Sequence, residues 1–358
     1  MGAKNTHGGI VVQLENSSYQ TGQEVTGMIH ISVKANLSPS TLYLCFVGKE
    51  RTHWTETRTV SETDSAGNTR SRTETDHYSG KLYACKFAYP ILSWNSGLYQ
   101  GGYSIPFSFR LPQNIPGSFS YNLGSADASI SYKIHIKLTG VSGEKITGKT
   151  EIHIRQGFDP NFSSQISQNV NARLKTWCCV DKGYCKLNVA YPQNSYHPSQ
   201  IAVCMAEVDN SESQLNVISI RNRFFYSIRL KTNNNRTHFV SNTLITTSIP
   251  IRIAAGASLL NASAVEIKLD LPSVSHILKS MYTTKGQLIE CMYTNEVGAE
   301  MEGSCMCCGN LPKILSYMNI VPNLIVPQAS APSAPPDWHP QMLQSISLQY
   351  DPQYEVQR

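Results

Sequence analysis

Apolar and polar residues alternate with a period of two along much of this chain. The clearest runs place an apolar side chain at every second position, and they lie at residues 29–33, 103–111, 130–138 and 265–271. Such alternation puts one face of a strand in a core and the other in water, as half-buried antiparallel strands require. Gly, Pro and Asn clusters separate the runs, and the best helical candidate, residues 161–174, is short. The pattern predicts an all-β protein.

The two halves of the chain resemble each other. Residues 19–23 (YQTGQ) and 196–200 (YHPSQ) each precede an expected strand, and residues 107–112 (FSFRLP) are matched by residues 267–272 (IKLDLP). The same two motifs recur in the same order, which favours a duplicated β-sandwich with a boundary near residues 157–171. A chance likeness between strand and turn sequences is the alternative.

Composition narrows the possible partners. The chain has 358 residues, enough for about two domains, with 41% hydrophobic residues. Charged residues make up only 15%, and 30 Lys and Arg against 25 Asp and Glu give a net charge of +5. Without a dense basic run, nucleic-acid binding is disfavoured, whereas an anionic membrane or phosphorylated tails stay compatible. No apolar run is long enough to span a bilayer and no secretory leader is visible, so we expect a cytoplasmic protein.

An ordered series of motifs carries a resemblance to a known family. In the first half these motifs are Tyr19-x-x-Gly22-x-x-Val25-x-Gly27, residues 42–50 (LYLCFVGKE), Trp54, residues 102–112 and Ile130-Ser-Tyr132. In the second half they are Tyr196, residues 208–211 (VDNS) and residues 271–275 (LPSVS). Over residues 8–323 the series resembles the arrestin superfamily, in particular the alpha-arrestins, or arrestin-domain-containing proteins.

The resemblance implies an arrestin fold, two tandem immunoglobulin-like antiparallel β-sandwiches. We place the N-terminal sandwich at residues 1–157, a linker at 158–175, the C-terminal sandwich at 176–325 and a disordered Pro-rich tail at 326–358. Residues 55–80 are polar with mixed charge, and we expect a long, mobile hairpin loop, a solvated insertion without a partner.

One position departs from the family. Receptor-regulating arrestins carry an Arg on the last N-domain strand, in a buried charge cluster that senses receptor phosphates. Aligning residues 151–155 with that strand puts Glu151 at the Arg position. The departure favours a trafficking role over phosphate sensing.

The cysteines supply a candidate metal site. Six of the ten fall in two clusters that we expect on loops: Cys178, Cys179, Cys185, Cys305, Cys307 and Cys308. Four converging thiolates could hold a structural zinc ion, but the paired C-x2-C spacing is missing, so plain thiols are the alternative. Cys45, Cys85, Cys204 and Cys291 lie in strand patterns and are expected to be core thiols. We expect no other cofactor.

Both ends of the chain carry short motifs. Met1-Gly2 with Thr6 fits the myristoylation pattern at Gly2, for which a plain start of small residues is the alternative. Alpha-arrestins often end in Pro-Pro-x-Tyr motifs that recruit WW-domain ubiquitin ligases. Here Pro335-Pro336-Asp337-Trp338 has Trp in place of Tyr, and Asp351-Pro352-Gln353-Tyr354 lacks the first Pro.

No catalytic motif stands out. Phosphate loops, nucleophile elbows and zinc-protease helices are missing from the sequence, and the ten His residues are dispersed. The resemblance implies a non-enzymatic adaptor that links cytoplasmic tails of membrane proteins to ubiquitin ligases or the endocytic machinery, with peripheral contact at the plasma membrane or endosomes. A coat-like scaffold of the retromer-subunit type is the first alternative, and an enzyme is the last.

Overall fold

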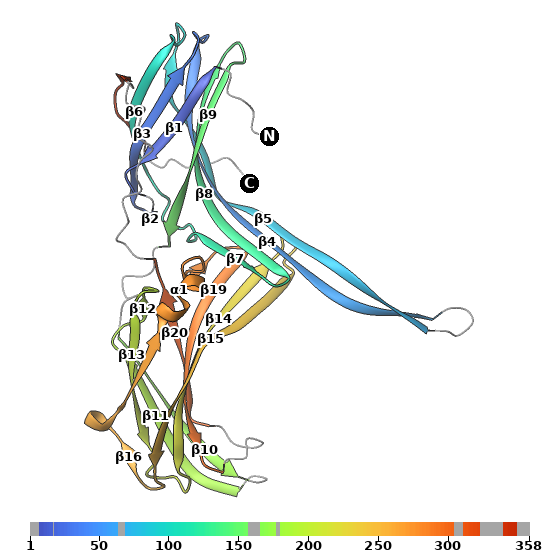
Figure 1. Ribbon diagram of the computed structural model, residues 1–358, viewed down its shortest axis with the longest axis vertical. Helices are drawn as coiled ribbons and strands as arrows, with labels where there is room; N and C mark the ends of the chain where they lie inside the picture. Colours follow the sequence, from blue (N-terminus) through green and yellow to red (C-terminus); the bar gives the residue numbers. More distant parts are fainter. Residues whose placement is uncertain are drawn as a thin grey trace.

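The protein is an elongated pair of β-sandwich domains joined end to end (Figure 1). The computed structural model describes residues 7–16, 18–63, 69–156, 165–176, 180–303, 311–322 and 339–348. The N-terminal domain holds strands β1–β9, and the C-terminal domain holds β10–β20. Among the described residues, no helix has the length and hydropathy to cross a membrane.

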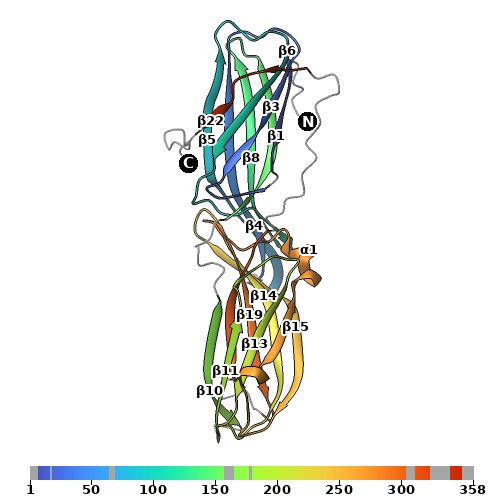
Figure 2. The same cartoon turned by 90° about the vertical axis from the view of Figure 1, so that its left-hand side faces the viewer.

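The N-terminal domain packs two sheets face to face. One has the order β1 (Gly8–Leu14), β3 (Glu24–Val33), β6 (Gly101–Arg110). The other has the order β2 (Ser18–Gln20), β9 (Lys145–Arg155), β8 (Ala126–Gly140), β4 (Ser40–Thr63), β5 (Thr69–Trp94), and β7 (Phe119–Leu123) also pairs with β8. Figure 2 looks onto the first sheet, so the second faces the opposite side of the molecule.

The C-terminal domain repeats this plan. One sheet has the order β10 (Ile166–Thr176), β11 (Val180–Tyr191), β13 (Ile201–Asp209), and β13 also pairs with β16 (Ser258–Leu259) and β17 (Val265–Asp270). The other has the order β12 (Ser195–Tyr196), β20 (Lys313–Ile320), β19 (Ile289–Met301), β14 (Val217–Lys231), β15 (Thr237–Ile253), with β18 (Thr284–Lys285) on β19. Short helical turns η2 (Asn261–Ser263), η3 (Leu271–Val274) and α1 (Ser275–Leu278) complete the domain.

The topology confirms the duplication that the sequence predicted. The sheets β2-β9-β8-β4-β5 and β12-β20-β19-β14-β15 have equivalent orders. In each domain the short strand that carries the repeated Tyr pairs in parallel with the last strand, β2 with β9 and β12 with β20. Both tyrosines, Tyr19 and Tyr196, are buried at these equivalent places.

The alternating runs form the cores as predicted. Phe107, Phe109 and Leu111 are at most 2% exposed, and Ile134 and Ile136 are fully buried. In the N-terminal core the rings of Phe46 and Tyr132 stack with centroids 5.7 Å apart, a geometry that adds to the gain from burying aromatic surface.

Two predictions were wrong, one for the segment between the domains and one for the C-terminal tail. Residues 161–174 were the best helical candidate and lay in the expected linker at 158–175, yet β10 begins at Ile166 and pairs with β11. Ile166, Val170 and Ala172 lie at even positions there, so period-two alternation decides the structure. The tail also has structure, because β21 (Gln341–Met342) and β22 (Ile346–Leu348) pair in parallel with β6. Leu343, Ile346 and Leu348 pack against the core, which explains the order of this segment.

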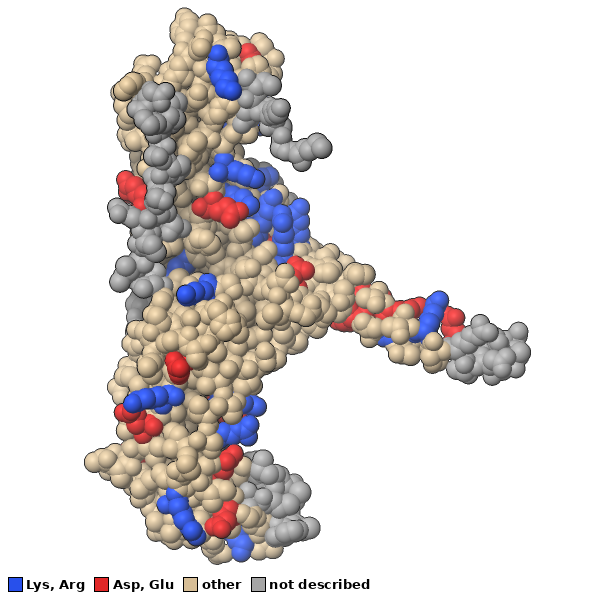
Figure 3. All heavy atoms as spheres, in the orientation of Figure 1, with Lys and Arg blue, Asp and Glu red and all other residues tan. Residues whose placement is uncertain are grey.

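The expected mobile loop at residues 55–80 is instead a two-stranded arm. Strands β4 and β5 continue in antiparallel register from Ser40↔Trp94 to Thr63↔Thr69, and the arm leaves the body where the domains meet (Figure 1). Charges of both signs follow it (Figure 3), and cross-strand ion pairs join Arg58 to Glu74 at 3.0 Å and Arg72 to Glu62 at 3.0 Å. Backbone pairing needs no core, so a polar sequence can form this ribbon.

Candidate functional site

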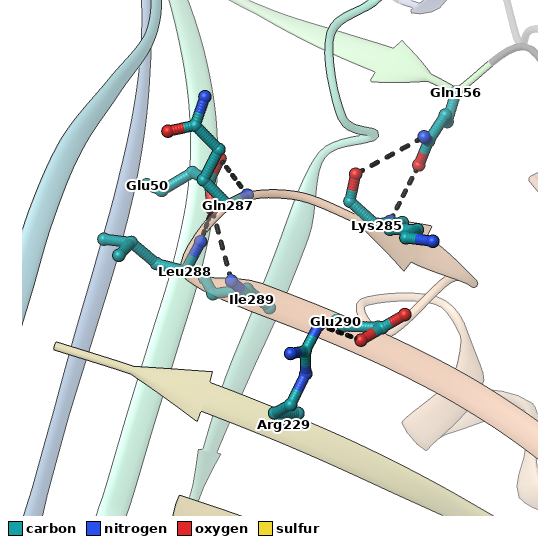
Figure 4. A network of polar contacts seen from close by, with 8 residues as sticks. All are labelled: Glu50, Gln156, Arg229, Lys285, Gln287, Leu288, Ile289 and Glu290. Carbon is teal, nitrogen blue, oxygen red and sulfur yellow. Dashed lines mark hydrogen bonds and ion pairs between the residues drawn. The ribbon is translucent and has the colours of Figure 1, made fainter. Parts of the chain in front are cut away.

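A buried carboxylate in β4 joins the two domains. Glu50 is 1% exposed and accepts hydrogen bonds from the backbone N–H groups of Gln287, Leu288 and Ile289 at 3.1, 2.8 and 3.2 Å (Figure 4). Gly286 makes room for it, because a Cβ there would lie 2.5 Å from the carboxylate. Three N–H donors on one buried anion give a short-range, directional link, since leaving such groups unsatisfied is costly.

A second link lies at the end of β9. The Gln156 side chain accepts a hydrogen bond from the Lys285 backbone N–H at 2.9 Å, and Thr284 Oγ1 accepts one from the Gly117 N–H at 3.0 Å (Figure 4 shows Gln156 and Lys285). Thr284 is buried, so this contact is shielded from water. Together with Glu50 it holds one domain against the other at two separated points.

The base of the arm is a third link. Arg236, from the turn between β14 and β15, forms an ion pair with Glu56 at 2.8 Å and lies over the Tyr78 ring at 4.0 Å. The Trp54 indole N–H donates to Glu56 at 3.0 Å, and its ring stacks on His238 with centroids 5.4 Å apart. The arm therefore starts from a fixed root shared by both domains.

A pocket of about 670 Å³ lies in the crease between the domains. The N-terminal domain lines it with Ser18, residues 118–120, residues 129–132 and residues 151–155, and the C-terminal domain with His197, residues 279–280, Tyr282 and Pro322. Ser120 donates its backbone N–H to the Ser280 carbonyl at 2.7 Å across the crease. The volume of the pocket is in the range of pockets that hold a small ligand or a peptide segment.

The charges around the pocket are mostly positive. Arg155 is half-buried, which lowers the pKa of its guanidinium, and it donates to the Gln20 side chain at 3.2 Å. Burial and the nearby Lys279 lower the pKa of His197. The carboxylate on this wall, Glu151, forms an ion pair with Lys133 at 2.6 Å, and that hydrogen bond lowers its pKa. Glu151, which the sequence comparison aligned with the Arg of receptor-regulating arrestins, forms an exposed ion pair on the sheet.

Among the described residues, one histidine–serine pair lies under the tail segment and another lies in an exposed turn beside the pocket. His30 Nδ1 lies 2.8 Å from Ser104 Oγ, but Ser104 is 1% exposed and its carbonyl accepts the Leu343 N–H of the tail segment. His197 Nδ1 lies 2.7 Å from Ser199 Oγ inside one exposed turn. In the second pair, His197 Nδ1 also accepts the Ser199 backbone N–H at 3.2 Å, as in a local turn.

Most of the short motifs singled out in the sequence lie outside the described residues. These are Gly2, Cys178, Cys179, Cys305, Cys307, Cys308, Pro335, Pro336, Trp338, Pro352 and Tyr354. Cys185 lies in the C-terminal core, where burial raises the pKa of its thiol to about 12. No group of three or more potential metal ligands is found among the described residues, and the two-cluster zinc site stays a prediction. Cys85, Cys204 and Cys291 are core thiols as expected, whereas Cys45 is half-buried.

The residues that join the domains were missed in the sequence, although one signal was available. Leu42, Leu44, Phe46 and Glu50 share the inward side of β4, so alternation alone places a carboxylate among core residues. A buried carboxylate requires donors, and these come from a turn more than 230 positions further along the chain. Gln156 and Thr284 lie in no pattern that would single them out.

Comparisons with known proteins assign the family. Residues 9–161 match the family model described as arrestin (or S-antigen), N-terminal domain. The N-terminal domain of this chain belongs to the arrestin superfamily. It is also similar to arrestin domain-containing protein A of Dictyostelium discoideum, with 23% identity over 206 residues. That match covers 56% of this chain and 34% of the relative, about a third of its length. The predicted arrestin fold is confirmed, and the alpha-arrestin subtype stays a prediction.

Proposed function

We propose that this arrestin-domain protein is a non-enzymatic adaptor that links the cytoplasmic tail of a membrane cargo protein to a ubiquitin ligase or the endocytic machinery. The observation that carries the proposal is the crease pocket, which both domains line. A concave site between two sandwich domains offers loops and strand ends for recognition of an extended peptide. The links through Glu50 and Gln156 keep this site preformed, which lowers the entropy cost of binding.

The Pro-rich tail supplies the second half of the proposal. Pro335-Pro336-Asp337-Trp338 and Asp351-Pro352-Gln353-Tyr354 are degenerate docking motifs for WW domains. Two weak contacts on one chain can act together, because the tether raises the effective concentration of the second. A ligase held by the tail would then work on cargo held in the crease.

The ligase half is tested by pull-down with WW-domain ligases. We compare the intact chain, a chain that ends at Gln328 and a Trp338→Ala, Tyr354→Ala double variant. A chain that ends at Gln349 is the matched control, because it keeps β22 on β6 and removes only the second motif. The intact chain should capture ligase, and the Gln328 and double variants should lose it. Equal capture by all variants, or by none, would contradict the ligase bridge.

The cargo half is tested at the crease. Arg155→Glu and Lys279→Glu reverse charges on the two walls of the pocket, one from each domain. Co-precipitation of a membrane protein should fall in both variants and stay unchanged in Lys182→Glu, which lies away from the pocket. Unchanged capture in the crease variants would place cargo elsewhere.

A coat-like scaffold of the retromer-subunit type remains the second candidate function, because the arm and the long two-domain body would suit assembly as well as recognition. Such a scaffold should keep its assembly when the tail is removed, whereas an adaptor should lose its ligase. A myristoyl group on Gly2, detectable by intact mass after expression in a eukaryotic cell, would add reversible membrane contact to either function.

A further inference from the structure

One side of the N-terminal domain carries an excess of positive charge. Outside the crease pocket, strands β9, β8, β4 and β5 present eight cations at outward positions: Lys49, Arg51, Lys81, Lys86, Lys133, Lys137, Lys145 and Lys149. We call these residues the lysine face. Figure 3 shows Lys and Arg atoms gathered on this domain above the root of the arm.

The strand register makes the lysine face one continuous surface. Lys133 lies beside Val47, which lies beside Lys86, while Lys49 lies beside Tyr83 in the next row. Neighbouring strands are about 4.8 Å apart, and outward residues on one strand are about 6.6 Å apart. The charges therefore spread over the outward face of one sheet.

Carboxylates neutralise little of this charge. Two of them, Glu151 and Asp127, lie at outward positions of the same described strands, and each has a partner: Glu151 with Lys133 at 2.6 Å and Asp127 with His53 at 3.1 Å. Among the described residues, no carboxylate lies within ion-pair distance of the other seven cations. Two of these seven, Lys49 and Lys86, instead lie over the ring of Tyr83 at 5.3 and 5.1 Å.

The pKa of a histidine in the middle of the lysine face reflects the same positive charge. His135 is half-buried, and after burial the charges of Lys133, Lys149 and Lys49 lower the pKa of its imidazole. Like charges held this close repel one another, so the arrangement costs some stability. A partner with negative charge would relieve this cost.

We propose that the lysine face binds an acidic segment of a partner protein. Charge complementarity selects the chemistry, and an open sheet face with long lysine side chains suits an extended acidic chain, which needs no pocket. The lysine face is separate from the tail motifs and from the crease pocket, so the proposal goes beyond the adaptor function and can stand without it.

The arm argues against a membrane as the occupant. It projects from the side of the molecule that carries the lysine face (Figures 1 and 2). Residues 55–63 alone span about 26 Å of extended strand. A bilayer lying on the face would take Arg58, Glu74 and Asp76 into hydrocarbon, which is strongly unfavourable. A polypeptide segment can lie beside the arm.

The test uses a fluorescent octaglutamate peptide and anisotropy at about 30 mM salt, where screening is weak. The full chain should bind the peptide, and a Lys49→Gln, Lys86→Gln, Lys137→Gln, Lys149→Gln variant should bind about tenfold more weakly. The control replaces Lys34, Lys268, Lys285 and Lys313 by Gln, which removes the same charge away from the face and should change affinity less than about twofold. Thermal unfolding confirms that both variants fold.

Three results would overturn the proposal. The first is a failure of the full chain to bind octaglutamate, and the second is equal binding by the face variant and the control variant. The third is face-dependent binding of phosphatidylserine vesicles or of a short DNA duplex while octaglutamate stays unbound, which would assign the surface to a membrane or to nucleic acid. None of these results depends on ligase capture or on the crease variants.

Discussion

The two equivalent sheets β2-β9-β8-β4-β5 and β12-β20-β19-β14-β15 differ most on their outward faces. On the lysine face of the N-terminal sheet, seven of eight cations lack a carboxylate partner among the described residues. In the C-terminal sheet, arginines of β14 face glutamates of β19 across the ladder: Arg223 pairs with Glu296 at 3.2 Å, Arg221 with Glu300 at 3.9 Å, and Arg229 with Glu290. The outward face of the N-terminal sheet thus keeps its positive charge, whereas ion pairs neutralise the charge on the outward face of the C-terminal sheet.

The difference shows that the fold constrains the inward positions of a sheet more than the outward positions. Most inward positions of both sheets are apolar, because each sandwich must bury one face. Outward positions are free of that demand, so cross-strand pairs can stabilise one sheet while unpaired lysines stay available on the other. The equivalent hairpins also differ in length, since β4 and β5 have 24 and 26 residues and extend into an arm, whereas β14 and β15 have 15 and 17.

Truncation of an inward ring should affect both domains alike and give the largest effect. Phe46 in β4 and Phe224 in β14 are both fully buried. We expect Phe46→Ala and Phe224→Ala each to lower the free energy of unfolding by about 3–5 kcal/mol. Urea unfolding of the two variants measures this. A loss below about 1 kcal/mol in either would break the equivalence of the cores.

Removal of the carboxylate that joins the domains should come next. Glu50→Ala leaves three N–H groups of the C-terminal domain without their acceptor, two of them in buried hydrogen bonds, and we expect a loss of about 2–4 kcal/mol. Glu151→Ala, an exposed carboxylate on the same sheet, is the control and should cost under about 0.5 kcal/mol. Equal losses would mean that Glu50 adds nothing beyond an ordinary surface charge.

Double-mutant cycles compare the two faces directly. Glu296 is 12% exposed, so we expect a coupling of about 1–2 kcal/mol between Arg223 and Glu296. Glu151 is 69% exposed, so its coupling with Lys133 should stay below about 0.5 kcal/mol. A stronger coupling for the Lys133 pair than for the Arg223 pair would reverse the comparison.

The smallest effect concerns the titration of His135. Burial and three lysines lower its pKa below the ordinary value of 6.5 in the folded state. As pH falls below 6.5, the unfolded chain takes up a proton that the folded chain resists, so this residue makes the protein less stable on acidification. Its NMR midpoint should move upward in a Lys133→Gln, Lys149→Gln variant. An unchanged midpoint would leave burial as the sole cause.

The sequence predicted the architecture because alternation depends on local pattern. The strands around Phe107 and Ile134 followed from it. The repeated motifs at Tyr19 and Tyr196 indicated the duplication, and the ordered motif series carried the resemblance to the superfamily. The predictions for three segments were wrong, because the local pattern of apolar residues does not show what holds these segments in place. Residues 55–80 form a ribbon held by backbone pairing rather than by a core. Residues 166–174 alternate too weakly to show a strand, and residues 341–348 are ordered by contacts with distant β6.

The site was harder to predict than the fold. The domain links through Glu50 and Gln156 join residues far apart in sequence, and a periodic pattern of apolar residues does not reveal such contacts. The lysine face was invisible for another reason. Its cations are spaced singly along four strands, so no dense basic run marks them, and only the register brings them together.

Site-specific photo-crosslinking from native membranes tests the account most directly. A photoreactive phenylalanine replaces one residue at a time: Tyr282 in the crease, Tyr43 on the outward side of β4 beside the lysines, and Tyr317 on the outward face of β20, which is 65% exposed. Mass spectrometry identifies each product. The account predicts that one membrane protein with an acidic cytoplasmic segment crosslinks at Tyr282 and Tyr43 and not at Tyr317. Equal crosslinking at all three positions, or crosslinking of a membrane protein at Tyr317 alone, would contradict it.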